Sequence, residues 1–126
     1  MAKLFLMAAS FSGFLAVAIG AFGAHGLKQK ISQEMMAVYQ TGVQYHFYHT
    51  LALLGVGILL QQFPQSMPFK VSGWAMLAGM LVFSGSLYLL VLSGTRWLGA
   101  ITPIGGVTLL LAWLALAVGI YQSVGR

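Results

Sequence analysis

Three histidines are the residues best able to carry chemistry in this sequence, and all of them border the first two apolar stretches. His25 follows the first stretch, and His46 and His49 open the second. On a helix, His46 and His49 point within about 60° of each other, because successive residues turn by about 100°. Three imidazoles suit zinc or copper, and an apposed pair could clasp haem iron or relay protons. The plainer alternative is that these histidines are hydrogen-bonded to backbone or water at the headgroup level, beside ordinary interfacial tyrosines.

Residues for acid–base or nucleophilic catalysis are scarce. Glu34 is the only acid, and there is no cysteine. A catalytic metal centre normally needs carboxylates that orient its ligands, and acid–base catalysis usually needs one as well. The sequence contains no nucleophile elbow, zinc-protease motif or phosphate-binding glycine loop. We therefore expect a protein that is not an enzyme and that carries no cofactor.

The elements that position these residues are membrane-spanning helices. The chain has 126 residues, of which 60% are hydrophobic and 6% charged, whereas soluble domains carry about 25% charged residues. A helix needs roughly 20 apolar residues to cross a bilayer. The sequence predicts one membrane domain over residues 1–126, an all-α integral membrane protein with an antiparallel four-transmembrane-helix bundle, whose spans lie near residues 4–24, 45–62, 72–93 and 98–121.

Span two is short and polar at its start. Glutamines near one helical face of residues 31–44 predict an interfacial helix there. It could also run into span two as one long helix, because Gly42 is the only weak point. Near the start of span four, Pro103 predicts either a kink or the first turn of a helix, and we favour the first turn.

Basic residues are scattered along the chain. They outnumber the single acid by six to one and give a formal net charge of +5. Because they are not clustered, a nucleic-acid-binding face is not expected. Cations at the ends of apolar runs reach lipid phosphates, so the expected partner is the lipid bilayer. The six are Lys3, Lys28, Lys30, Lys70, Arg96 and Arg126.

Small residues predict where the helices pack, because lipid supplies no hydrophobic drive for helix association and close approach needs small side chains. Span one has a row of them at four-residue spacing, and spans three and four contain glycines in similar positions. A pore through so small a chain would need a homo-oligomer, which such surfaces could build. The expected packing residues are Ser12, Gly13, Ala16, Gly20, Ala24, Gly79, Gly105 and Gly106.

Several short strings resemble a known family of membrane proteins. They are Gly-Ala-Phe-Gly-Ala-His-Gly-Leu at 20–27, Gln-Thr-Gly at 40–42 and His-Thr-Leu-Ala-Leu at 49–53. Phe-Ser-Gly-Ser-Leu-Tyr at 83–88 and Thr-Pro-Ile-Gly-Gly at 102–106 extend the match over most of the chain. The chain resembles uncharacterised protein family 0382, small bacterial membrane proteins that are similar to the eukaryotic transmembrane protein 256. The resemblance implies a multi-pass, four-helix protein of the bacterial plasma membrane, with no established substrate, reaction or cofactor.

The resemblance also selects the candidate site. His25 and His49 fall on motif positions, whereas His46 fits the pattern less well, which weakens a three-histidine metal site. We expect His25 and His49 to converge, approached by polar residues of the later spans. The candidate polar site is His25, Gln40, Thr41, Tyr45, His49, Ser84, Ser86, Tyr88 and Thr102.

Two functions remain open at this point. The favoured one is non-enzymatic: helix packing and assembly, or passage of a small solute, proton or lipid through an oligomer. The alternative is a membrane metal, haem or quinone binder that uses His25 and His49.

Overall fold

Four long helices make up most of the protein, whose computed structural model describes residues 1–125, so that Arg126 lies outside the described residues. Each helix is long and apolar enough to cross a membrane, and no strand occurs among the described residues. The expected all-α, four-span fold is confirmed. In chain order the elements are α1 (Ala2–Phe22), the π-helical turn η1 (Gly23–Leu27), α2 (Gln33–Gln62), α3 (Met67–Ser93), the 3-10 turn η2 (Arg96–Ala100) and α4 (Thr102–Ser123).

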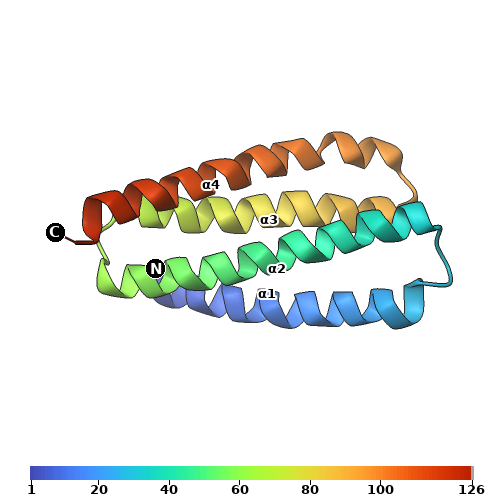
Figure 1. Ribbon diagram of the computed structural model, residues 1–126, viewed down its shortest axis with the longest axis horizontal. Helices are drawn as coiled ribbons and strands as arrows, with labels where there is room; N and C mark the ends of the chain where they lie inside the picture. The colour runs from blue at the N-terminus through green and yellow to red at the C-terminus, as the bar shows by residue number, and fades with distance from the viewer. Residues whose placement is uncertain (126) are drawn as a thin grey trace.

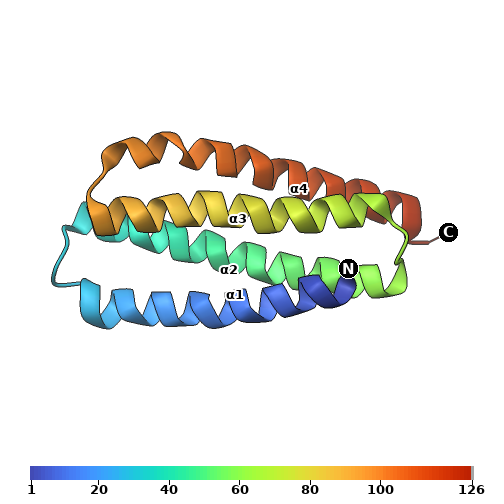
Figure 2. The ribbon, with the colours of Figure 1, turned by 180° about the vertical axis from the view of Figure 1, so that it is seen from behind.

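The helices run antiparallel in the spatial order α1, α2, α3, α4, as Figures 1 and 2 show from opposite sides. Each helix packs closely against the next one along the chain, whereas α1 does not pack along α3. On that face of α2, side-chain packing leaves a cleft between α1 and α3.

Local sequence signals explain where the helices begin and end. Ser32 and Ser66 precede α2 and α3, and the side-chain oxygen of each accepts a backbone N–H of the first turn. Gly94 ends α3 with φ 71°, a left-handed conformation that favours glycine. Pro103 stands in the first turn of α4, as expected for a helix start rather than a kink.

Helix α2 is one continuous helix of 30 residues. The helical extension expected before span two is its first third, and there is no break at Gly42. The missing side chain of Gly42 instead makes room for an aromatic ring, because a Cβ atom there would lie 3.0 Å from Cε1 of Tyr88. Gly42 thus serves the packing of α2 against α3.

Aromatic side chains close the α1–α3 side of the bundle at both ends. Near the chain termini, fully buried Phe5 fills the space over Gly73 and contacts the ring of Trp74 edge-on, with centroids 5.3 Å apart. At the opposite end, the ring of Tyr39 lies over Gly23, and its hydroxyl donates to the Ile19 carbonyl at 2.5 Å. Between these two contacts α1 packs along α2 and touches α3 at Ser12, whose hydroxyl lies 3.4 Å from the Met80 sulfur.

Most of the predicted small residues lie at helix contacts. A Cβ atom on Gly105 would lie 2.5 Å from the backbone nitrogen of Phe83, so α3 and α4 touch backbone to backbone there. Ala24 is exposed and takes no part. The others face a neighbouring helix: Ser12, Gly13, Ala16 and Gly20 on α1, Gly79 on α3 and Gly106 on α4.

Candidate functional site

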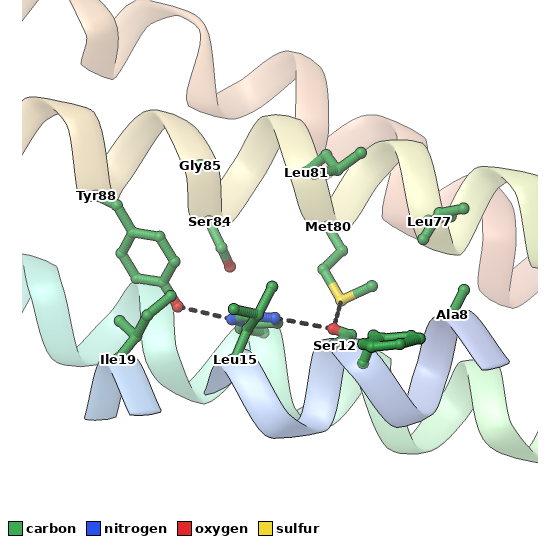
Figure 3. Close-up of a pocket in the computed structure, with 12 residues that line it drawn as sticks. Ala8, Ser12, Leu15, Ile19, Leu77, Met80, Leu81, Ser84, Gly85 and Tyr88 are labelled. Atoms are coloured by element: carbon green, nitrogen blue, oxygen red, sulfur yellow. Dashed lines mark hydrogen bonds between the residues drawn. The ribbon is translucent and has the colours of Figure 1, made fainter. Parts of the chain in front are cut away.

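A chain of hydrogen bonds joins three helices at the centre of the bundle (Figure 3). The His46 ring on α2 bonds through Nδ1 to the Tyr88 hydroxyl of α3 at 2.9 Å. Through Nε2 it bonds to Ser12 Oγ of α1, also at 2.9 Å. Ser12 and His46 are only 9% and 8% exposed. Polar side chains within a membrane span are costly and therefore mark functional sites by default.

The chain of hydrogen bonds continues from Ser12 to Thr50 and ends at the sulfur of Met80. Ser12 Oγ lies 2.6 Å from Thr50 Oγ1, and both oxygens lie 3.4 Å from the Met80 thioether sulfur. Met80 is the central residue of α3 and is packed in the apolar core with Leu53 and Met76. The polar chain therefore ends near the middle of the bundle.

Proton counting gives the chain a direction. A neutral imidazole has one N–H, and a thioether only accepts hydrogen bonds. If Tyr88 donates to His46, His46 donates from Nε2 to Ser12, Ser12 donates to Thr50 and Thr50 donates to Met80, then every donor is satisfied. In the reverse direction the Tyr88 hydroxyl proton has no partner among the described residues. Because a buried unpaired donor costs about 1–3 kcal/mol, the first direction is the stable one.

This chain lies along one side of a cleft of about 330 Å³ between α1 and α3. Apolar side chains make most of its walls, including Leu15 and Ile19 on α1 and Leu77 and Leu81 on α3 (Figure 3). No charged residue lines it. Its polar lining is Ser12, His46, Ser84 and Tyr88.

The cleft is reached from the side. Toward the chain termini, Phe5 is buried against Gly73, and a second hollow continues past Ala8 and Leu77 to Lys3. Toward the α1–α2 connection, the Tyr39 ring contacts the Tyr88 ring at 5.6 Å between centroids. Side chains on its rim are strongly exposed on the outer surface of the bundle; Leu81, for example, is 67% exposed. In a membrane that surface meets lipid, so a molecule would enter from the bilayer rather than from water.

His49 lies on another face of α2 and is fixed by α4. The Trp113 Nε1–H donates to His49 Nε2 at 3.0 Å. Because Nε2 is then an acceptor, the ring proton is on Nδ1, which donates to the Tyr45 carbonyl at 2.7 Å. Both nitrogens are occupied by protein partners, which leaves none for a metal or haem iron.

The groove beside His49 is wider and more open, with a volume of about 810 Å³. Aromatic rings line it: Tyr45 stacks on Phe83 at 4.6 Å and packs against Tyr48 at 5.8 Å between centroids. The side chains of Tyr45 and Tyr48 are exposed, by 39% and 55%. They face outward from the bundle at the level of His49.

The structure does not bring His25 and His49 together. Gly13 lies level with Thr50, since its Cβ would be 3.6 Å from Thr50 Cγ2. Exposed His25 lies about 18 Å further along the helix axis than Gly13, and therefore far from His49, the neighbour of Thr50. No three histidine or acidic side chains within residues 1–125 are placed to hold a metal ion. His25 and His49 therefore do not converge as expected, because they lie at different levels along the bundle axis and His49 faces α4.

The remaining candidates separate into local pairs. Ser84 donates to the Gly42 carbonyl at 2.7 Å, and Ser86 bonds Thr102 at 2.6 Å, tying α3 to α2 and to α4. Thr41 donates to a carbonyl of its own helix, and Gln40 is exposed. Of the predicted polar residues, only Ser84 and Tyr88 line the cleft.

Sequence reasoning missed the residue at the centre of the site. His46 was set aside as less characteristic of the family, and Ser12 was expected only to pack helices. Thr50 and Met80 are not among the residues predicted for the polar site. A usable signal was present, because Ser12 and Thr50 lie well inside their apolar stretches, where an unpaired hydroxyl is costly.

Comparison with known proteins gives the chain's relatives. A family described as a protein of unknown function (DUF423) matches residues 19–106. The UPF0382 membrane protein YwdK of Bacillus subtilis (strain 168) is 44% identical over 116 residues, 92% of this chain and 94% of that protein. The UPF0382 membrane protein SAB0533 of Staphylococcus aureus (strain bovine RF122 / ET3-1) is 42% identical over 123 residues, 98% of this chain and 99% of that protein.

No solved structure is significantly similar to the chain. The matched region begins at Ile19, which accepts the Tyr39 hydrogen bond, and extends beyond Tyr88 into the start of α4. It thus contains His46, Thr50 and Met80, while Ser12 lies outside it. The chain belongs to the UPF0382 (DUF423) family of bacterial membrane proteins.

Proposed function

We propose that this protein is a non-enzymatic binder of a neutral, lipid-dissolved molecule in the bacterial plasma membrane, with the α1–α3 cleft as its site. One observation carries the proposal: a hydrogen-bond chain without formal charge lines a mostly apolar cleft whose rim residues are exposed on the outer surface of the bundle. A cleft of about 330 Å³ is within the range of small-molecule sites, roughly 300–1,000 Å³.

The polar residues of the cleft are better explained by a ligand than by stability alone. Helices in lipid can associate through small residues and van der Waals contact, as α3 and α4 do at Gly105. Placing His46 inside the bundle, at an open cleft, adds desolvation cost that packing does not require. A ligand that uses the free acceptor positions of Tyr88 and Ser84 accounts for their location.

A transmembrane proton or solute path through one copy of the chain is disfavoured. Beyond Met80, toward the chain termini, the interior is packed with apolar side chains such as Phe5, Leu53 and Phe69. A thioether neither donates a proton nor carries one onward at ordinary pH. The polar chain therefore reaches halfway into the bundle, which suits binding rather than transport across it.

Ser12 and His46 form the pair that begins a serine-hydrolase triad, but the rest of the machinery is missing from their surroundings. Ser12 lies inside α1, where neighbouring backbone N–H groups are already used by the helix, so no oxyanion hole faces it. Tyr88 stands where a triad has a carboxylate, and a phenol supplies no negative charge to stabilise an imidazolium. Glu34, the only acid, pairs with Arg96 at 4.0 Å on the surface.

The experiment measures which lipids stay with the protein during purification. A leucine at Gly85 fills the cleft without a clash, because Gly85 lines it and a Cβ there meets nothing within 4 Å. Gly55 offers the matched control: its Cβ also meets nothing within 4 Å, and it lies outside the cleft. Protein purified in mild detergent is extracted, and the retained neutral lipids are identified by mass spectrometry.

We expect a neutral lipid to be enriched with the wild type and with Gly55→Leu and to be lost with Gly85→Leu. Thermal unfolding of both variants, at midpoints near the wild type, shows that the fold is intact. Equal retention by all three proteins, or no enrichment of any neutral lipid, would overturn the proposal.

A further inference from the structure

Resting on the proposed function of the cleft, we propose that its ligand is a lipid-soluble quinone that binds in both its oxidised and its reduced form. The observations that carry this inference are the depth of the polar chain, the absence of charge around it and its ability to reverse direction.

Charge and depth restrict the ligand first. No Lys, Arg, Asp or Glu lines the cleft, so an ionised phosphate or carboxylate would be buried without a partner at high cost. Ser12 lies near the middle of α1, and the Tyr88 hydroxyl is separated from it only by the His46 ring, which bonds both, whereas phospholipid headgroups stay at the membrane surface. A ligand whose polar group reaches this depth is a neutral molecule dissolved in the bilayer interior.

The chain can offer either a donor or an acceptor at its open end. In the direction described above, Tyr88 donates to His46, and the Tyr88 oxygen is free to accept from a ligand hydroxyl. If Ser12 donates to Nε2 instead, Nδ1–H donates to Tyr88, and the Tyr88 hydroxyl donates to a ligand carbonyl. The two states differ only in the His46 tautomer and in hydroxyl rotation.

A quinone and its quinol present these two opposite groups at the same position. The quinone carbonyl needs a donor, and the quinol hydroxyl needs an acceptor. A single buried serine or tyrosine hydroxyl could donate to the quinone and accept from the quinol, but each switch would leave its hydrogen bond to the protein without a matching donor or acceptor. Here the His46 tautomer changes together with the Tyr88 hydroxyl, and the Ser12 and Thr50 hydroxyls rotate to match it. The Tyr88 ring and the Met80 thioether, which line the cleft at different levels of α3, suit a flat, polarisable ring.

The test uses a decyl-chain benzoquinone and its quinol, titrated anaerobically against purified protein in detergent with binding measured by calorimetry. We expect both forms to bind, with affinities within about tenfold of each other, since each makes one hydrogen bond to Tyr88. Gly85→Leu abolishes binding of both forms, and Gly55→Leu leaves it unchanged. Tyr88→Phe weakens both by roughly three- to tenfold.

Ser12→Ala gives a signature that a merely structural role would not produce. With quinone bound, the variant leaves His46 Nε2 as an unpaired acceptor; with quinol bound, it leaves an unpaired N–H donor. An unpaired donor is the costlier of the two. The affinity for the quinol therefore falls more than that for the quinone, by roughly threefold.

The outcomes separate this inference from the function beneath it. If neutral lipids are retained through the cleft but neither form of the probe binds, the quinone assignment is refuted while the binding function stands. If only one form binds, or Ser12→Ala lowers both affinities equally, the reversal of the chain is refuted. If Gly85→Leu changes neither lipid retention nor probe binding, the cleft is not the site and both proposals are lost.

Discussion

Removing the Ser12 hydroxyl tests whether the polar chain holds α1 to its neighbours. Ser12→Ala removes the bonds of Oγ to His46 at 2.9 Å and to Thr50 at 2.6 Å. Hydrogen bonds between membrane helices contribute on average about 0.6 kcal/mol each, with a maximum near 1.7. Two such bonds predict a loss of about 1 kcal/mol in the free energy of unfolding, and about 3 kcal/mol at most. The orphaned His46 ring keeps only its bond to Tyr88.

The assay is reversible unfolding in mixed micelles with increasing sodium dodecyl sulfate. Ser10→Ala is the matched control: Ser10 is on the same helix but exposed, and its hydroxyl bonds only to the Leu6 carbonyl of its own turn. We expect the control to stay within about 0.5 kcal/mol of wild type. In a double-mutant cycle with Thr50→Val, the two changes couple by roughly 0.6 kcal/mol. If Ser12→Ala unfolds like Ser10→Ala, or the cycle is additive, the chain is not a stabilising network.

Two further predictions concern helix contacts. Gly105→Ala places a Cβ atom 2.5 Å from the backbone nitrogen of Phe83, and we expect it to lower the free energy of unfolding by about 1–3 kcal/mol. The control Gly55→Ala, whose Cβ meets nothing within 4 Å, is neutral or stabilising. Equal stabilities of the two variants would refute the close contact. The exposed Tyr48 side chain lines the aromatic α2–α4 groove, and we predict a homo-oligomer through that face. Tyr48→Cys, in a chain with no native cysteine, then forms disulfide-linked dimers in membranes, while Phe14→Cys on α1 does not. Cross-linking at both positions or at neither would count against this interface.

The fold was predictable because its signals are local. Four apolar stretches, one proline in a first turn and glycines at close contacts follow from composition and spacing, and the structure has them. Before span two, the sequence predicts either an interfacial helix or one long helix, and the structure has the long helix. Helical periodicity did not predict that Tyr39 and Gly42 in its first third are buried against α1 and α3. Burial against another helix is a tertiary contact that helical periodicity does not report.

The site was harder to predict because it depends on which face of α2 meets which helix. His46 and His49 are separated by less than one turn, yet His46 bonds α1 and α3 while His49 bonds Trp113 of α4. That small rotation assigns them to different sites. In the string at 20–27, His25 is the residue predicted for the site, yet it is exposed. Gly23 of the same string is buried, and the Tyr39 ring packs over it.

The central claim is that the α1–α3 cleft binds a neutral molecule from the bilayer, and an experimental structure in lipid nanodiscs prepared from bacterial membranes tests it most directly. We expect continuous non-protein density between Leu15 and Leu81, reaching hydrogen-bond distance of the Tyr88 hydroxyl. If α1 instead packs closed against α3 and the cleft holds no density, the claim is contradicted.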